Sequence, residues 1–486
     1  MPNRTPLDAF IAANRFGYGL RGIDELNRIA ADPQQWLLGQ IGDRRNPGTT
    51  ITADLPTSSD MIARFRASRD AKDRETMNDF NKDARETLND EIFFRFRHAV
   101  STDRPFAERL VEFWSNHFTV SGKSKVIVIG LLGAFEREAI RPHVFSTFED
   151  LLLAAERHPA MLQYLDNAQS IGPNSQAGRR RKKGLNENLA REILELHTLG
   201  VDGGYTQADV IALAKIITGW TVKPPQIEGK DGFMFVPQMH EPGVKVFLGH
   251  RYGSEAALAS PTGNKKSDRR AAKSANQSAP APILANGDGF EEGASALRNL
   301  ARHPSTARFI CTKLARHFIA DNPPAAAIAA LESVFLRTKG SLPDVYRALI
   351  GLNEVWHTPL AKFKPPHDYL VSVFRITGIV PDEERGRGAI MQGLTMFDHM
   401  PFMALSPAGW GDTEGDWLSP DALMNRVDWA YSFARQVQSQ IADPVAFAKG
   451  AIGPATTAAA LTAIAQAPSK ADAIALVLAA PATMRR

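Results

Sequence analysis

Helical periodicity runs through almost the whole chain, and this feature limits the fold more than any other. Strand patterns appear only at residues 232–236 and 244–249, where short Phe, Met and Val runs stand between Gly and Pro. They predict one small β-hairpin with its turn at residues 240–243. A doubly wound α/β fold needs strands that alternate with helices, so this pattern excludes it. We therefore predict a mainly α, multi-helical globular bundle with one small β-hairpin.

Length and composition predict a soluble globular protein of more than one domain. The chain has 486 residues, enough for two or three domains, and its 44% apolar and 23% charged residues are ordinary values for that class. Residues 254–288 are rich in Ser, Ala, Pro, Lys and Asn, which predicts a flexible insertion. The predicted order is an N-terminal helical region (1–221), the hairpin (222–253), the insertion, and a C-terminal helical region (289–486).

Charge and hydropathy restrict the partners. The net charge of +4 is too small for a nucleic-acid-binding protein, which usually carries a clustered basic stripe, but it suits an anionic substrate. No apolar run approaches the length of a membrane span. The N-terminus lacks the apolar core of a secretory signal, so the sequence as given predicts a cytoplasmic location, or an exported one if a signal has been removed. Cys311 lies in an amphipathic helix and is expected to be a buried apolar residue rather than a nucleophile.

Residues 186–200 form the strongest helical pattern. Gly200 closes this helix, and Thr206 with Asp209 forms a capping box that starts the next one. Stepping by 100° per residue places His197 with the apolar residues. A polar face gathers on the opposite side: Glu187, Asn188, Arg191, Glu192, Glu195 and Thr198. Periodicity favours the interpretation that this face is solvated and stabilised by a Glu–Arg pair. Glu192 and Glu195 slightly favour the alternative, a polar cluster that points into a cleft, because like charges three positions apart cost helix stability.

A second informative helix covers residues 105–118. Its apolar side includes His117, with Asn116 at the edge, whereas Glu108, Arg109 and Glu112 are predicted to face solvent. An inward histidine is most often bonded to a core carbonyl, but two of them, His117 and His197, would indicate a site if they met.

Two further segments offer polar or aromatic groups. Arg141 and His143 flank a helix break, where they either bind a carboxylate or sulfate or form a surface turn. The Gly- and Pro-punctuated loop at 401–421 holds Trp410, Asp412, Asp416 and Trp417. Tryptophan faces stack on sugar rings and carboxylates bond to sugar hydroxyls, so the loop is a candidate sugar-binding site. The alternative is an ordered structural loop whose tryptophans pack into the core, and both interpretations stay open.

Several short strings together resemble one bacterial family, the one catalogued as domain of unknown function 1800. They are Leu185–Gly200, Phe113-Trp114-Ser115-Asn116-His117-Phe118, Ile140-Arg141-Pro142-His143, His158–Asn167, His303–Phe309, Ser406–Trp410 and Trp417–Arg426. The resemblance covers most of the chain and implies no catalytic residues. It implies a protein partner encoded nearby, because members often stand beside a sulfatase-like protein, and it points to glycans or other anionic material.

The first functional hypothesis is a hydrolase or lyase that cleaves an acidic polysaccharide by carboxylate acid–base chemistry. Such chemistry needs a protonated and an ionised carboxyl group that flank the bond, supplied here by different segments. The predicted catalytic residues are Glu192, Glu195, Asp412, Asp416 and His117. The predicted substrate-binding residues are Asn116, Arg141, His143, Asn188, Arg191, Trp220, Trp410 and Trp417.

Two alternatives belong to other classes. A metal site from Glu192, Glu195, His117 and His197 ranks lower, because His197 points away from both glutamates on the helical wheel. A non-catalytic scaffold or partner of an exported enzyme fits the absence of a familiar catalytic motif in the sequence. No cofactor and no bound metal are expected.

Overall fold

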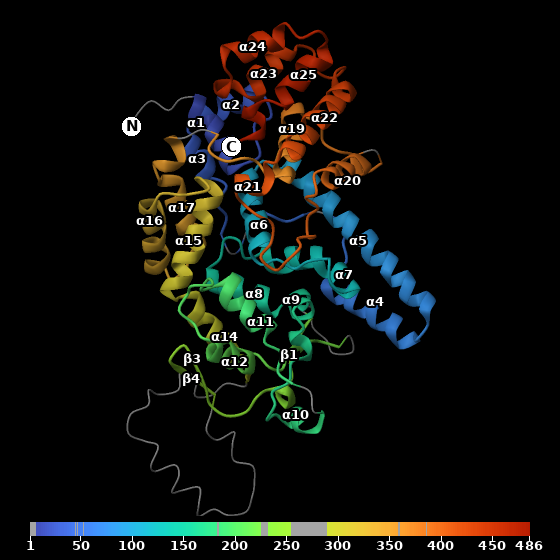
Figure 1. Ribbon diagram of the computed structural model, residues 1–486, viewed down its shortest axis with the longest axis vertical. Helices are drawn as coiled ribbons and strands as arrows, with labels where there is room; N and C mark the ends of the chain where they lie inside the picture. The colour runs from blue at the N-terminus through green and yellow to red at the C-terminus, as the bar shows by residue number, and fades with distance from the viewer. Residues whose placement is uncertain are drawn as a thin grey trace, which may run out of the picture. The chain divides into compact units, whose positions relative to one another are not determined.

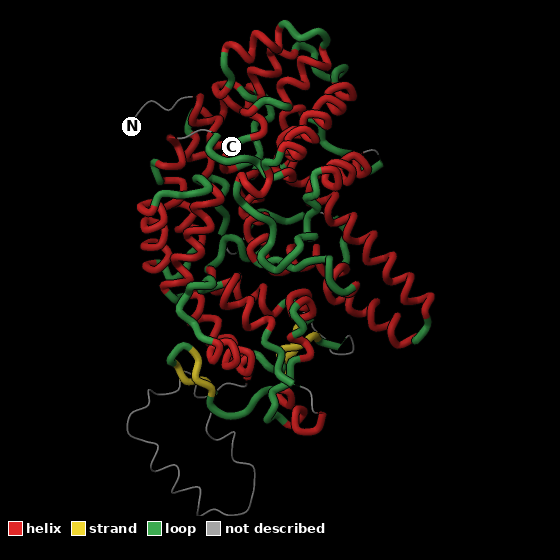
Figure 2. Tube along the Cα trace, viewed as in Figure 1, coloured by secondary structure: helices red, strands yellow, loops and turns green. Residues whose placement is uncertain are grey.

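The computed structural model describes residues 6–43, 45, 47–51, 53–181, 184–224, 232–253, 289–357, 360–384 and 386–486. Helices dominate these residues, and the strands are few and short (Figure 2). The predicted mainly α fold with a small β-hairpin is thus confirmed. Within the described ranges, each helix is too short or too polar to cross a lipid bilayer. The insertion predicted at 254–288 lies outside the described residues.

The chain divides into two compact units that do not follow its order. Unit 1 comprises residues 1–56, 81–148 and 310–486, and unit 2 comprises residues 57–80 and 149–309. Three helices contribute residues to both units: α5 (Arg74–Ser101), α8 (Phe148–Arg157) and α15 (Pro304–Phe318).

Unit 1 is a helical assembly in which α23, α24 and α25 lie together beside α22, and α16 packs along α17 (Figure 1). Its elements are α1 (Pro6–Ile11), η1 (Ala12–Phe16), α2 (Ile23–Ala30), α3 (Pro33–Leu38), α6 (Pro105–His117), α7 (Val126–Phe135), η2 (Glu136–Ile140), α16 (Ala325–Arg337), α17 (Leu342–Gly351), α18 (Glu354–His357), α19 (Pro366–Thr377), α20 (Gly386–Met396), α21 (Glu414–Trp417), α22 (Pro420–Val437), α23 (Pro444–Ala451), η7 (Gly453–Ala455), α24 (Ala458–Ala465), α25 (Lys470–Leu478) and α26 (Pro481–Met484).

The core of unit 1 is aromatic. Trp114 on α6 is fully buried beside Phe118 and Phe148, and its indole Nε1 donates to Tyr346 Oη at 2.6 Å. Cys311 is fully buried, as the sequence predicts. This packing fixes α6, the helix that carries Arg109, Glu112, Asn116 and His117.

Unit 2 combines helices with the strands. Its elements are α4 (Ser58–Ala71), α9 (Pro159–Tyr164), η3 (Asn167–Gln169), α10 (Gln176–Arg181), α11 (Asn188–Glu192), η4 (Ile193–His197), α12 (Gln207–Ile216), β1 (Trp220–Val222), β2 (Phe233–Phe235), η5 (Pro237–Met239), β3 (Lys245–Phe247), β4 (His250–Tyr252) and α14 (Gly289–Ala301).

β2 and β3 lie where the sequence predicts strands, but it predicts neither β1 nor β4, and the predicted pairing is wrong. β2 pairs with β1, and β3 pairs with β4, both antiparallel. Leu248 and Gly249 between β3 and β4 have φ of 48° and 74°. Two consecutive positive φ values are typical of a tight two-residue hairpin turn, so β3 closes locally on β4 instead of reaching back to β2.

The signature helix at 186–200 ends where predicted, and the next helix, α12, begins where predicted. Gly200 has φ of 82°, and Thr206 and Asp209 form the capping box of α12. Thr198 is fully buried, however, and its hydroxyl donates to Ile193 O, so its predicted place on the polar face is wrong. The cause is the π-helical turn η4, because the step of 100° per residue does not hold through a widened turn.

Gly200 is the position in this segment where a side chain is least tolerated. A Cβ there would lie 2.8 Å from Phe309 Cδ2, and its backbone is left-handed. We expect Gly200→Ala to lower the free energy of unfolding by about 1 to 3 kcal/mol, measured by urea denaturation. Gly184→Ala is the matched control, because a Cβ there meets nothing within 4 Å. Equal stability of both variants would contradict this role of Gly200.

Candidate functional site

Five of the predicted site residues line one cavity of about 340 Å³ in unit 1: Asn116, His117, Trp410, Asp412 and Asp416. Residues that the sequence analysis did not select line it as well, among them Arg95, Glu112, Lys313, Arg316, His317, His367, Asp368 and His399. Helices α5, α6, α15, α19 and α21 and the loop before α21 supply these side chains. The cavity is therefore the candidate functional site of the chain.

A polar stripe runs along α6, and two of its residues, Glu112 and Asn116, line the cavity. Arg109, Glu112 and Asn116 follow a spacing that places them on one helix face. The predicted exposure of Glu108, Arg109 and Glu112 is wrong, since the first two are 1% exposed and Glu112 is largely buried. The helical pattern identified the polar face correctly, but other segments of unit 1 cover that face.

Asn116 fixes the segment at residues 401–421 that carries Trp410 and Trp417, called the tryptophan loop below. Its Oδ1 accepts from Trp410 N at 2.7 Å, and its Nδ2 donates to Trp410 O at 2.9 Å. Gly409 makes this approach possible, because it has φ of 81° and a Cβ there would lie 2.5 Å from Asn116 O. Both polar ends of the Asn116 amide thus bond to protein backbone, so its contribution is to position Trp410.

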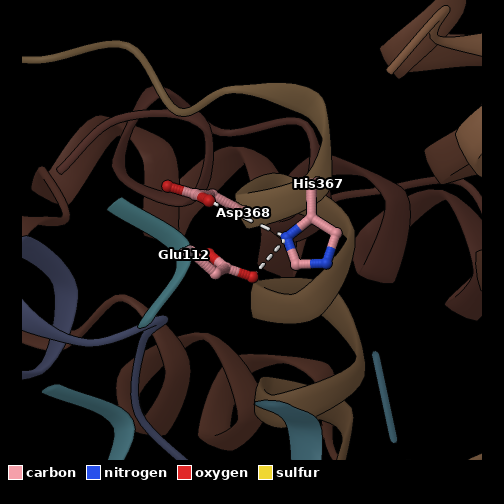
Figure 3. Close-up of side chains that lie close together, drawn as sticks. All are labelled: Glu112, His367 and Asp368. Carbon is pink, nitrogen blue, oxygen red and sulfur yellow. Dashed lines mark ion pairs between the residues drawn. The ribbon is translucent and has the colours of Figure 1, made fainter. Parts of the chain in front are cut away.

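The triad Glu112, His367 and Asp368 joins α6 to α19 (Figure 3). Glu112 Oε1 lies 3.0 Å from His367 Nδ1, and Asp368 Oδ1 lies 3.9 Å from the same nitrogen. Pro366 occupies the first position of α19, which starts this helix and sets both α19 residues in its first turn. His367 N also donates to His399 Nδ1 at 3.1 Å, which fixes that turn.

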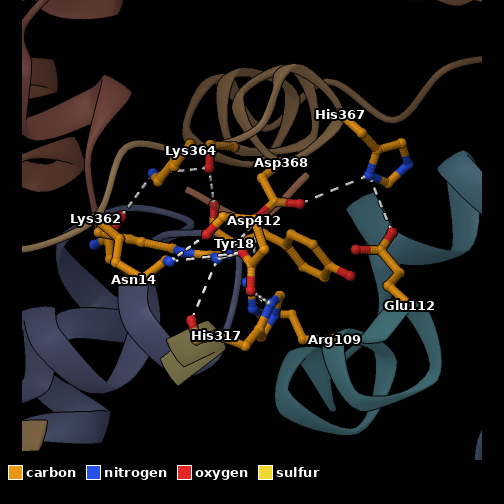
Figure 4. Close-up of polar contacts among 12 residues, drawn as sticks. Asn14, Tyr18, Arg109, Glu112, His317, Lys362, Lys364, His367, Asp368 and Asp412 are labelled. Atoms are coloured by element: carbon orange, nitrogen blue, oxygen red, sulfur yellow. Dashed lines mark hydrogen bonds and ion pairs between the residues drawn. The ribbon is translucent and has the colours of Figure 1, made fainter. Parts of the chain in front are cut away.

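Buried cations surround the carboxylates (Figure 4). Arg109 Nη1 donates to Asp368 Oδ2 at 2.6 Å, and Arg486 contacts the same oxygen. Arg109 Nη2 also donates to His317 Nε2 at 2.9 Å. A guanidinium can only donate, so His317 carries its proton on Nδ1 and donates it to Asp412 Oδ2 at 2.9 Å.

Asp412 is held in its ionised form. Burial opposes its ionisation, but His317 and Lys362 outweigh that cost and keep the pKa of this carboxyl below its usual value. Lys362 Nζ also donates to Asp412 O at 2.6 Å, which anchors the loop. Asp416 is exposed, and its Oδ2 accepts from the backbone and hydroxyl of Thr413 in a capping box.

Lys313 and His117 form a second polar pair in the cavity wall. Lys313 Nζ lies 3.0 Å from His117 Nδ1, and His117 is 2% exposed. Burial lowers the pKa of Lys313 to about 8, so a substantial part of this amine is neutral just above neutral pH. A neutral amine on a cavity wall can accept a proton from a substrate.

Aromatic rings gather at the tryptophan loop. The ring of His399 lies 4.9 Å from that of Trp410 and 4.5 Å from that of Trp417. Trp410 lines the cavity and Trp417 lines an adjoining pocket that also contains Trp410 and Asp416. Both tryptophans are partly exposed, which a ring that stacks on a sugar requires.

Arg141 lies in the interior of unit 1 rather than on a surface turn. It is 3% exposed, and its Nη2 lies 2.6 Å from both Glu108 Oε1 and Glu136 Oε1. Burial opposes the ionisation of Glu136, but Arg95 and Arg141 outweigh it and lower the pKa of this carboxyl to about 2. His143 is partly buried with its Nδ1 2.9 Å from Ala139 O.

The remaining predicted residues belong to unit 2. Arg191 forms a surface cluster with Glu187, Glu195 and Gln207, and Asn188 is exposed. Glu192 is partly buried, and burial raises the pKa of its carboxyl.

Trp220, predicted to bind substrate, and His197, predicted to face inward, are both core residues of unit 2. Trp220 is fully buried against Phe233 and Phe290, which leaves its ring no exposed face for a ligand. His197 is buried with its Nδ1 2.7 Å from Glu156 Oε1, whereas His117 belongs to unit 1.

The sequence offered a weak signal for the residues that were missed. His367 and Asp368 follow Lys364-Pro365-Pro366, a string that predicts the start of a helix. A His-Asp pair directly after a helix-starting proline places two potential ligands or acid–base groups on one rigid turn. Their partner Glu112 is distant in sequence, so spacing alone could not connect them.

Comparison with known proteins places this chain in one family. It belongs to the family described as "Protein of unknown function (DUF1800)", which matches residues 11–485. No curated protein and no solved structure matched the chain. The predicted family resemblance is confirmed.

The structural position of Arg141 predicts a stability effect. Arg141→Met removes a buried counterion of Glu108 and Glu136, so we expect a loss of about 3 to 5 kcal/mol in the free energy of unfolding, measured by urea denaturation. Arg435→Met is the control, because Arg435 is exposed on α22. A stable Arg141→Met protein that had lost only ligand binding would instead support the predicted substrate-binding role.

The Asn116 amide predicts a local effect on Trp410. Asn116→Ala removes two hydrogen bonds to that residue, so we expect about 1 to 3 kcal/mol lower stability and stronger acrylamide quenching of tryptophan fluorescence. Asn116→Asp keeps the acceptor and should show a smaller effect. The quenching difference should vanish in a Trp410→Phe background; if it persists there, another tryptophan is responsible.

Proposed function

We propose that this protein cleaves an acidic polysaccharide by β-elimination and that the cavity of unit 1 is its active site. The observation that carries the proposal is the partly buried Lys313 amine, 3.0 Å from His117 Nδ1 in the cavity wall. Burial lowers the pKa of Lys313 to about 8, which is close to the value that suits a general base near neutral pH.

Elimination suits the cavity better than hydrolysis does. Hydrolysis needs one protonated and one ionised carboxyl group beside the bond. Of the two carboxylates expected from the tryptophan loop, Asp412 has a lowered pKa, and Asp416 Oδ2 is engaged in a helix cap. The lysine is therefore the better candidate for the proton transfer.

The proposed step balances with a single acid–base residue. The neutral Lys313 amine removes the proton on the carbon next to the carboxylate of a uronic acid. The C–H electrons form a carbon–carbon double bond, and the neighbouring glycosidic C–O bond breaks. The Lys313 ammonium then returns the proton to the departing oxygen, so neither water nor a redox partner is consumed.

Other cavity residues support an acidic sugar. Arg316 lines the cavity and supplies positive charge near the negative charge that develops on the carboxylate. The face of Trp410 can stack on the C–H face of a sugar ring, in the position that Asn116 fixes.

Lys313→Met tests the base directly, and its apolar replacement suits a buried site. We expect kcat on hexuronic acid polymers to fall by at least about 100-fold, measured by the ultraviolet absorbance of the new conjugated double bond. Wild-type kcat/KM should rise with pH and level off above about 8, where Lys313 is neutral. Lys449→Met, an exposed lysine of the same unit, should retain full activity.

Other results would redirect the proposal. New chain ends without a double bond would indicate hydrolysis. Glu192→Gln tests the competing site in unit 2, and loss of turnover in that variant would move the active site there. Failure of the wild type to cleave any uronic acid polymer would favour the non-catalytic role as a partner of another protein.

A further inference from the structure

We infer that Glu112, His367 and Asp368 bind one divalent transition-metal ion. One potential ligand atom from each residue lies within 4.8 Å of the others, and all three residues line the cavity of unit 1 (Figure 3). Ligands about 2.1 Å from an ion lie about 3.0 Å apart at a right angle and about 3.4 Å apart at the tetrahedral angle. The distance of 3.0 Å from His367 Nδ1 to Glu112 Oε1 falls in this range, whereas the 3.9 Å distance to Asp368 Oδ1 exceeds it and must shorten when an ion binds.

The geometry around His367 Nδ1 favours a shared ion over a simple hydrogen bond. Glu112 Oε1 is buried and lies 3.0 Å from that nitrogen, yet it has no contact with hydrogen-bond geometry. An acceptor oxygen lies along the N–H axis, whereas an oxygen that shares an ion at a right angle lies about 45° away from it. A short but misaligned N···O contact is what a common ion would produce. Arg95 Nη1 lies 3.4 Å from His367 Nε2, so binding of the ion to Nδ1 requires the ring proton to move to Nε2 and this contact to break.

The surrounding residues hold the ligand atoms in place. Arg109 and Arg486 both bond to Asp368 Oδ2, which leaves Oδ1 on the side of His367. The bond from His367 N to His399 fixes the first turn of α19. Such supporting contacts orient metal ligands in known sites and tune their affinity.

The donor set indicates the class of ion. One imidazole nitrogen with two carboxylate oxygens suits Mn²⁺, Fe²⁺, Co²⁺ or Zn²⁺ better than Ca²⁺ or Mg²⁺, which prefer oxygen ligands alone. Three protein ligands leave coordination positions open toward the cavity, where water or an anionic substrate group can bind. This inference rests on the triad and does not depend on the proposed elimination.

Metal binding can be measured on the tag-free full chain after treatment with a chelator. We expect Co²⁺ to bind with one ion per chain, with visible absorption bands, and Zn²⁺ to displace it. Glu112→Gln should weaken Co²⁺ binding by more than about 100-fold with an unchanged circular dichroism spectrum. Asp416→Asn is the matched control, because Asp416 is a carboxylate of the same cavity outside the triad.

A measurement on the wild type keeps the test independent of variant folding. Pulsed electron paramagnetic resonance of bound Mn²⁺ should detect coupling to one imidazole nitrogen, that of His367. Absence of saturable binding of Co²⁺, Zn²⁺ and Mn²⁺ would overturn the inference and leave Arg95, 3.2 Å from Glu112 Oε1, as the counterion of this carboxylate. Unchanged binding in Glu112→Gln, equal weakening in Asp416→Asn, or no nitrogen coupling would each overturn the assignment to this triad.

Discussion

The buried ion pairs around α6 are the constraint on which the rest of unit 1 depends. Arg141 lies between Glu108 and Glu136, and Arg95 contacts Glu136 at 2.8 Å. Charges in the interior must be paired, because an unpaired one costs several kcal/mol of solvation free energy. Removal of any member therefore leaves another uncompensated, so the network holds α6 and the π-helical turn η2 in one relative position. The cavity residues of α6 are placed by that constraint.

The polar stripe of α6 makes three different contacts with other segments of unit 1. Arg109 pairs with Asp368, Glu112 approaches His367, and Asn116 holds Trp410. Each contact reaches a segment far away in sequence, α19 or the loop before α21. A single rigid helix thus fixes a carboxylate, an imidazole and an indole relative to one another, which is the kind of preorganisation that acid–base chemistry or metal binding requires.

Local features of this fold were predictable from the sequence, whereas non-local pairings were not. The glycine that ends the signature helix and the capping box at Thr206 depend on residues that are close in sequence, and both were predictable. The ranges of β2 and β3 were predictable for the same reason. Their pairing was not, because the turn at Leu248–Gly249 let β3 close on β4. Likewise the π-helical turn η4 buried Thr198, which regular helical stepping had placed on the polar side.

The sequence by itself determined the helical class, the family and the residues that share a helix face. It also indicated Asn116, His117, Trp410, Asp412 and Asp416, which the structure gathers around one cavity. Only the tertiary structure decided that the polar face of α6 meets other polar groups instead of water, and that His367 and Asp368 complete the site. The physical reason is that periodicity states which side chains point the same way, whereas the segment that covers them is chosen by packing and charge pairing over the whole unit.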